Sequence, residues 1–231
     1  MMPIAENIAA IREKMSAAAL AAGRDPGEIL LVGASKMNDA AACKAAVAAG
    51  IDALGENRVQ EMTAKLAEDA YTGAPLHFIG HLQRNKVKQV VGKVDLIQSV
   101  GSLELLAEIE KTAAKLGIVQ NILLEVNVGM EEAKSGFAPQ DMDVAAMAAL
   151  ECPHVLVQGR MTIPPADASP EENRAYFHKV RALYVDINAK LFHNNFKYLS
   201  MGMSGDYEDA IACGATMVRV GSAIFGARHY T

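Results

Sequence analysis

Two positively charged residues lie in apolar segments that have the composition of buried strands. Lys36 directly follows the apolar residues 29–35, and Arg219 lies within the apolar residues 217–222. A cation in a buried strand costs several kcal/mol, on the order of the penalty for desolvating one ion, unless a partner stabilises it. If both segments are strands of one barrel, both cations reach the same cavity. A small anionic ligand is then the leading explanation for the two charges.

Hydroxyl groups and glycines near the same end of the chain supply donors for such a ligand. Ser200 and Ser204 share a strand face, since residues two apart point the same way. Gly221 and Ser222 follow the last apolar strand, where barrel folds usually bind phosphate. A partly buried lysine near another cation has a lowered pKa and can form a Schiff base with an aldehyde. Together with a cation at a ring nitrogen, these features describe a site for pyridoxal phosphate.

The elements that must position these residues follow a strand–helix alternation. Such alternation predicts right-handed crossovers and a parallel sheet. Eight units predict an α/β fold, a TIM-type (β/α)8 barrel, whose usual length of about 250 residues is close to the 231 present. An open flavodoxin-like sheet is the alternative, and it would usually need fewer strands. The predicted strands are 29–35, 52–56, 76–80, 96–100, 121–128, 154–161, 197–203 and 217–225.

Capping residues mark several of the predicted helix ends. Asn38 or Asp39 is placed to cap the first crossover helix, while Ser102 precedes and Gly117 follows another. Residues 83–88 form a polar, basic helix start for which a solvated face is expected. The predicted crossover helices are 40–49, 59–70, 103–116, 142–150, 170–191 and 207–213. An additional N-terminal helix, 4–22, places Ile4, Ile8, Ile11 and Met15 on one face.

Composition narrows the class of protein. A content of 51% hydrophobic residues is sufficient for a large core, and we expect residues 1–231 to form a single domain. The net charge of −5 argues against nucleic-acid or membrane-surface partners, which require a basic face. The three cysteines lack metal or redox spacing, and the N-terminus lacks a signal-peptide core, so a cytoplasmic location is expected. His77 and His81 share a strand face without a third ligand, and no metal site is predicted.

Six motifs in order carry a resemblance to a known family. The chain resembles the pyridoxal phosphate homeostasis protein family, which has the barrel fold of the alanine racemase N-terminal domain. The resemblance covers nearly the whole chain. The motifs are LVGASK at 31–36, GENRVQE at 55–61, HFIGHLQRNK at 77–86, EEAKSG at 131–136, LSMGMS at 199–204 and MVRVGSAIFG at 217–226.

The resemblance implies a monomeric single barrel that binds pyridoxal 5'-phosphate and acts in vitamin B6 homeostasis without established catalysis. By motif position, Lys36 is the Schiff-base lysine, Asn57 a cofactor neighbour and Arg219 the partner of the pyridine nitrogen. The resemblance implies that Ser200, Gly221 and Ser222 hold the phosphate. It implies the same role for Ser204 less strongly. Two departures affect the expected pocket mouth: residues 37–39 are Met-Asn-Asp where the family usually has Thr-Lys-Pro, and Arg58 replaces a common Tyr.

Three functions compete for the same residues. A pyridine nitrogen that accepts a hydrogen bond from Arg219 stays unprotonated, which weakens the ring as an electron sink and favours a protein that stores or hands over the cofactor. Pyridoxal phosphate-dependent apo-enzymes are then candidate recipients. A low-activity amino-acid racemase is the alternative. Racemising relatives take a second base from a C-terminal domain, and only five residues follow Gly226, so we expect no such domain. A Schiff-base aldolase acting on a sugar phosphate is the third candidate.

Overall fold

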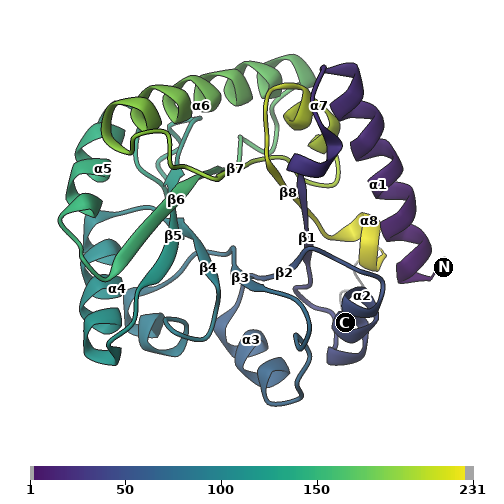
Figure 1. The fold of residues 1–231 in the computed structure, drawn as a ribbon, viewed down its shortest axis with the longest axis horizontal. Coiled ribbons are helices and arrows are strands. Elements are labelled where there is room, and N and C mark those ends of the chain that lie inside the picture. Colours follow the sequence, from purple (N-terminus) through teal and green to yellow (C-terminus); the bar gives the residue numbers. More distant parts are fainter. Residues whose placement is uncertain (1–2, 227–231) are drawn as a thin grey trace.

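A computed structural model of the chain describes residues 3–226, and within them eight parallel strands close into one barrel (Figure 1). Neighbouring strands follow sequence order around the ring, and β1 pairs with β8 to close it. The predicted TIM-type (β/α)8 barrel is therefore confirmed. The strands are β1 (Leu30–Ala34), β2 (Ala53–Glu56), β3 (Leu76–Phe78), β4 (Leu96–Val100), β5 (Gln120–Val126), β6 (Val155–Thr162), β7 (Tyr198–Ser200) and β8 (Met217–Val220).

Helices surround the barrel and cover its outer face (Figure 1). Asp39 caps the first crossover helix, since its Oδ1 accepts from the backbone N–H of Ala42 at 2.8 Å. Ser102 and Gly117 cap α4 as predicted, the glycine in the left-handed region with φ of 66°. The α-helices are α1 (Ile4–Ala21), α2 (Ala40–Ala48), α3 (Val59–Leu66), α4 (Leu103–Leu116), α5 (Met142–Leu150), α6 (Pro170–Leu191), α7 (Tyr207–Ala212) and α8 (Ser222–Phe225). The 3₁₀ helices are η1 (Pro26–Glu28), η2 (Arg84–Gln89) and η3 (Pro139–Asp141).

The predicted N-terminal helix is present as α1, which lies beside α2, α7 and α8 (Figure 1). Ile8, Ile11 and Met15 are buried along one face, as their spacing predicts. The side chain of Asn7 donates to the carbonyl oxygen of Ile224 at 2.8 Å. This bond ties α1 to α8, the short helix that follows the last strand.

Apart from shifts of one or two residues at element ends, four predicted elements are corrected by the structure, and the first is the predicted helix 59–70, which ends at Leu66. The predicted strand 217–225 ends at Val220, because Gly221 turns the chain into α8 and its carbonyl accepts from the N–H of Ile224 and of Phe225 at 2.9 Å. The predicted strand 197–203 shortens to Tyr198–Ser200, because Gly202 has a φ of 94° that a regular strand does not allow. The helix expected to start at 83–88 is the 3₁₀ helix η2.

A layer of apolar side chains lies inside the barrel, below its C-terminal mouth. Val32, Leu123, Met161 and Met217 belong to a buried cluster within the barrel, separate from the larger core between strands and helices. Side chains two residues apart on a strand point the same way. Arg219 follows Met217 of this layer by two residues on β8, so its side chain also points into the barrel, nearer the C-terminal end of the strand. The polar side chains of Arg219 and its neighbours therefore lie toward the C-terminal mouth.

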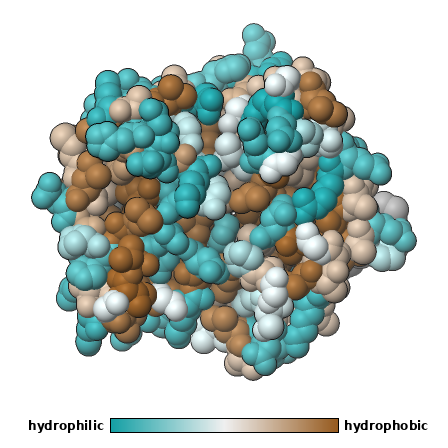
Figure 2. All heavy atoms as spheres, in the orientation of Figure 1, coloured by the Kyte–Doolittle hydropathy of each residue, from teal (hydrophilic) through white to brown (hydrophobic). Residues whose placement is uncertain are grey.

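The outer surface shows hydrophilic and hydrophobic residues interspersed on the face viewed in Figure 2. None of the helices within residues 3–226 combines the length and apolar character needed to cross a membrane. The three cysteines are free thiols. The expectation that no further domain follows Gly226 concerns residues outside the described range.

Candidate functional site

A cavity of about 270 Å³ opens at the C-terminal ends of β1, β7 and β8. Five of the seven residues predicted to bind a cofactor line it: Lys36, Ser204, Arg219, Gly221 and Ser222. They come from opposite ends of the sequence, and the pairing of β1 with β8 brings them together. The cavity therefore holds the predicted amine, the predicted guanidinium and three groups able to donate hydrogen bonds.

Arg219 is a buried cation whose hydrogen-bond acceptors are neutral groups. Its side chain donates from Nη1 to Ser200 Oγ at 2.6 Å and from Nη2 to the carbonyl oxygen of Thr162 at 2.8 Å. Burial lowers the pKa of Arg219 to about 10, against the opposing influence of Asp206 and Glu125. The guanidinium therefore stays charged at neutral pH. Among the described residues no carboxylate forms a salt bridge with it, so part of its desolvation cost is left for a ligand to offset.

A chain of buried hydrogen bonds supports Arg219 from inside the barrel. Ser200 Oγ accepts from Arg219 and donates to Gln98 Oε1 at 2.7 Å. Gln98 Nε2 in turn lies 3.0 Å from His77 Nδ1 and 3.1 Å from the sulfur of Met217. Because the Gln98 amide nitrogen is a donor, His77 Nδ1 must accept, and the ring is neutral with its proton on Nε2. The order of donors holds the guanidinium in one orientation.

The residues predicted to bind phosphate form a compact loop-and-turn arrangement. The N–H of Gly221 donates to Ser204 Oγ at 3.3 Å, and the backbone then enters α8 at Ser222. A Cβ at Gly221 would lie 3.1 Å from the carbonyl oxygen of Ala34, which is tighter than nine in ten real Cβ contacts, so glycine suits this close approach. Two hydroxyls and a backbone amide match the acceptor oxygens of a phosphate group. The donor set thus fits the phosphate end of the predicted cofactor.

Two predicted residues lie outside the lining of this cavity. Ser200 is fully buried and uses its hydroxyl on Arg219 and Gln98, so the geometry supports a role in holding the guanidinium. Asn57 follows β2, and its Oδ1 is buried without a hydrogen-bond partner. A Cβ at Gly80 would overlap the backbone of Asn57, which keeps that loop close to the next strand end. The roles of both toward a cofactor remain predictions.

The structure adds residues that the sequence reasoning did not connect with the site. Thr162, Gln98 and the pair Glu56 and Lys65 are all buried. Thr162, Gln98 and Glu56 are polar residues within or at the end of apolar strand segments, a pattern that could have indicated inward-facing groups. Lys65 carried no such signal, because a lysine on an amphipathic helix is usually solvated.

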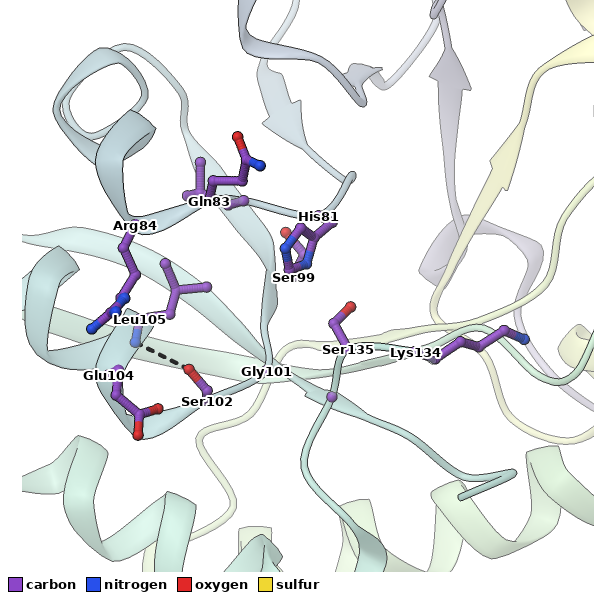
Figure 3. A pocket seen from close by; sticks show the side chains of 12 residues that line it. His81, Gln83, Arg84, Ser99, Gly101, Ser102, Glu104, Leu105, Lys134 and Ser135 are labelled. Atoms are coloured by element: carbon purple, nitrogen blue, oxygen red, sulfur yellow. Dashed lines mark hydrogen bonds between the residues drawn. The ribbon is translucent and has the colours of Figure 1, made fainter. Parts of the chain in front are cut away.

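A second, larger hollow of about 610 Å³ occupies the side of the mouth formed by the loops after β3, β4 and β5 (Figure 3). His81, Ser99 and Ser135 are among its lining residues. Ser135 donates to Glu125 Oε2 at 3.0 Å, and burial raises the pKa of Glu125. Glu125 lies in β5, and the Ser135 hydrogen bond and the charge of Arg219 oppose this rise. Within residues 3–226, no three His, Cys, Asp or Glu side chains gather to hold a metal ion.

Comparison with known proteins gives consistent matches over the whole chain. Residues 3–229 match the family model for the alanine racemase N-terminal domain. The chain is 42% identical to the pyridoxal phosphate homeostasis protein of Aquifex aeolicus, over 99% of this chain and 100% of that protein. It is also 42% identical to the protein of the same name from Pseudomonas aeruginosa, over 100% and 98% of the two chains. The structure of PipY from Synechococcus elongatus PCC7942 with PLP bound is similar, with a TM-score of 0.83, 32% identity and coverage of 96% and 100%.

Ser200→Ala tests whether the hydroxyl supports Arg219. The change leaves Nη1 of a buried cation without its acceptor, which we expect to lower the free energy of unfolding by about 1–3 kcal/mol. Urea denaturation measures the difference. Ser204→Ala is the matched control, because that hydroxyl lines the cavity, and its loss should cost less than about 1 kcal/mol. Equal losses in the two variants would contradict the role given to Ser200.

The buried neutral His77 predicts acid sensitivity. Burial lowers the pKa of His77 to about 4. In the unfolded chain the value returns to about 6.5, so between these values the unfolded state binds a proton that the folded state does not. This contribution to stability is fully present above pH 6.5 and is lost as the pH falls toward 4, by about 3 kcal/mol. Urea denaturation at several pH values should show a shallower decline for His77→Gln, whereas the exposed His178→Gln should follow the wild type.

Proposed function

This chain belongs to the pyridoxal phosphate homeostasis protein family, and from that premise we propose that it binds pyridoxal 5'-phosphate as a Schiff base on Lys36 and acts in homeostasis of that cofactor. The proposal extends to a single barrel domain over residues 1–231, a cytoplasmic monomer, and PLP-dependent apo-enzymes as recipients. These extensions rest on the sequence and on the family.

One observation carries the proposal: Lys36 and the uncompensated cation Arg219 line the same cavity as three hydrogen-bond donors. An amine supplies the covalent attachment, since it condenses with an aldehyde to a C=N bond with loss of one water. A guanidinium supplies a fixed donor for a ring nitrogen. The hydroxyls of Ser204 and Ser222 and the amide of Gly221 supply the phosphate contacts. A ligand with aldehyde, ring nitrogen and phosphate uses every one of these groups.

The charge on Arg219 favours a protein that stores the cofactor over an enzyme that uses it for catalysis. When bound, the cofactor acts as an electron sink most strongly if its ring nitrogen is protonated. Arg219 has no acceptor site and keeps its own proton at neutral pH, so it can only donate to that nitrogen. Ser200 and Thr162 hold the guanidinium in a fixed orientation. These residues therefore bind and orient the ring while leaving its nitrogen unprotonated.

Lys36→Ala tests the attachment. The wild-type chain mixed with pyridoxal 5'-phosphate should show the visible absorption band of a Schiff base, and borohydride reduction should fix the cofactor to the peptide that contains Lys36. The variant should lose both signals at that position. Lys44→Ala, an exposed lysine on α2, is the control and should retain them. A wild-type protein without the band in excess cofactor would refute the proposal.

An amino-acid racemase of low activity is the second candidate, favoured by the polar hollow at the same barrel mouth, which has room for another reactant (Figure 3). Racemisation requires removal of the Cα proton of an amino acid. Exchange of that proton of alanine for deuterium in heavy water, followed by NMR, measures the step directly. Because Arg219 leaves the ring a weak electron sink, we expect no exchange above that of free pyridoxal 5'-phosphate. Exchange that exceeds this level and is lost in Lys36→Ala would favour the racemase.

A further inference from the structure

A strained turn presents Lys36 to the cavity. The N–H of Asn38 donates to the carbonyl oxygen of Ser35 at 3.1 Å, so Lys36 and Met37 are the two central residues of a tight turn after β1. Met37 has a φ of 64°, in the left-handed region that disfavours residues with a Cβ. The turn therefore needs support from outside itself to persist.

That support comes from two side chains on one face of α3. Glu61 Oε2 accepts from the N–H of Met37 at 2.7 Å, and Lys65 Nζ donates to the carbonyl oxygen of Ser35 at 2.8 Å. The two residues are four positions apart and so lie one above the other on the helix. Together they hold the backbone on both sides of Lys36.

The Lys65 ammonium is itself held by a buried cluster. Its side chain is 7% exposed, and it lies 2.6 Å from Oε1 of Glu56, which is fully buried at the end of β2. The same oxygen accepts from Ser35 Oγ at 2.6 Å and from Tyr71 OH at 2.9 Å. Burial and the neighbouring Glu56 raise the pKa of Tyr71, so its phenol remains a donor. We call Ser35, Glu56, Lys65 and Tyr71 the buried turn cluster.

The location of the buried turn cluster indicates its role. A buried ion pair contributes little net stability, because desolvation of both ions offsets their attraction. Glu56 and Lys65 nevertheless converge on Ser35, the residue directly before Lys36. A hydrogen bond from the charged Lys65 ammonium to the carbonyl oxygen of Ser35 restricts the turn more strongly than one from a neutral donor would. The cluster is built to fix the backbone from which the Lys36 side chain starts.

We propose that Lys65, oriented by Glu56 and Tyr71, is a positioning residue for Lys36, fixing the turn that aims its amine into the cavity. This inference rests on the proposed function, since it assigns the cluster to attachment of pyridoxal 5'-phosphate at Lys36. A loosely held turn leaves the amine in many positions and lowers the fraction that can meet the aldehyde carbon. The cluster thus sets the rate of attachment, whereas Arg219 and the phosphate donors set binding of the unattached cofactor.

The test compares Lys65→Met and Tyr71→Phe with the wild-type chain. Stopped-flow absorbance gives the rate at which the Schiff-base band forms after mixing with pyridoxal 5'-phosphate, and borohydride trapping confirms the site. Displacements on the order of 1 Å can slow a reaction by about a hundredfold, so we expect Lys65→Met to slow attachment by about ten- to a hundredfold and Tyr71→Phe by a smaller factor. Tyr184→Phe is the control. Tyr184 lies on α6, and its buried hydroxyl donates to the carbonyl oxygen of Phe196 at 3.2 Å. Removal of this hydroxyl should leave the rate of attachment unchanged.

A rescue variant separates positioning from general stability. Glycine adopts the conformation of Met37 without strain. Met37→Gly added to Lys65→Met should therefore recover part of the lost rate, which a purely structural role of Lys65 does not predict. If Lys65→Met does not fold, Tyr71→Phe alone decides the question by its rate. Variants that lose stability and yet attach the cofactor at the wild-type rate would overturn this inference and leave the proposed function intact, whereas failure of the wild type to form the band would remove the proposed function itself.

Discussion

The parallel pairing of β1 with β8 is the constraint on which the rest of the structure depends. Val32 on β1 lies opposite Arg219 on β8, so the two strands place their C-terminal ends at the same part of the barrel mouth. Lys36 follows β1 by two residues, and Gly221 follows β8 directly. Without this closure the amine and the guanidinium would belong to distant parts of the chain. With it, they line one cavity.

Two buried cations, Lys65 on α3 and Arg219 on β8, have different kinds of partner. Lys65 is paired with Oε1 of Glu56 at 2.6 Å, so the two opposite charges balance each other. Within residues 3–226, the Arg219 guanidinium has only a hydroxyl and a carbonyl oxygen as hydrogen-bond partners, and it keeps a charge that faces the cavity. The first arrangement suits a group that fixes backbone, because nothing further is needed to balance it. The second suits a group that binds a ligand, because an acceptor offsets the remaining desolvation cost.

The hydrogen bonds from Arg219 through Ser200 and Gln98 to His77 connect the mouth to the opposite end of the barrel. Each hydrogen bond in this chain has a defined donor and acceptor. A proton on His77 Nδ1 would remove the acceptor for Gln98 and so disrupt the hydrogen bonds that lead to Arg219. Burial keeps His77 neutral until the pH is well below its usual titration range. The orientation of Arg219 is therefore independent of pH over the range in which a free histidine titrates.

Much of the fold was predictable because its signals are local. Apolar segments of strand length alternate with helical segments, and capping residues such as Ser102 and Gly117 mark helix ends within a few positions. Two of the errors fell where glycine conformation decided the outcome: Gly221 turns the chain into α8, and Gly202 ends β7 early. Residue type alone does not specify which conformation a glycine adopts.

The sequence by itself determined the barrel and identified the amine of Lys36, the guanidinium of Arg219 and the predicted phosphate donors around Gly221. Only the tertiary structure decided that Ser200 holds Arg219, that Gln98 and Thr162 support it, and that Lys65 lies buried against Glu56 behind the turn at Lys36. The physical reason is the range of the contacts. Strand faces and turns depend on neighbours along the chain, whereas the partner of a buried polar group is selected by packing between elements that are distant in sequence.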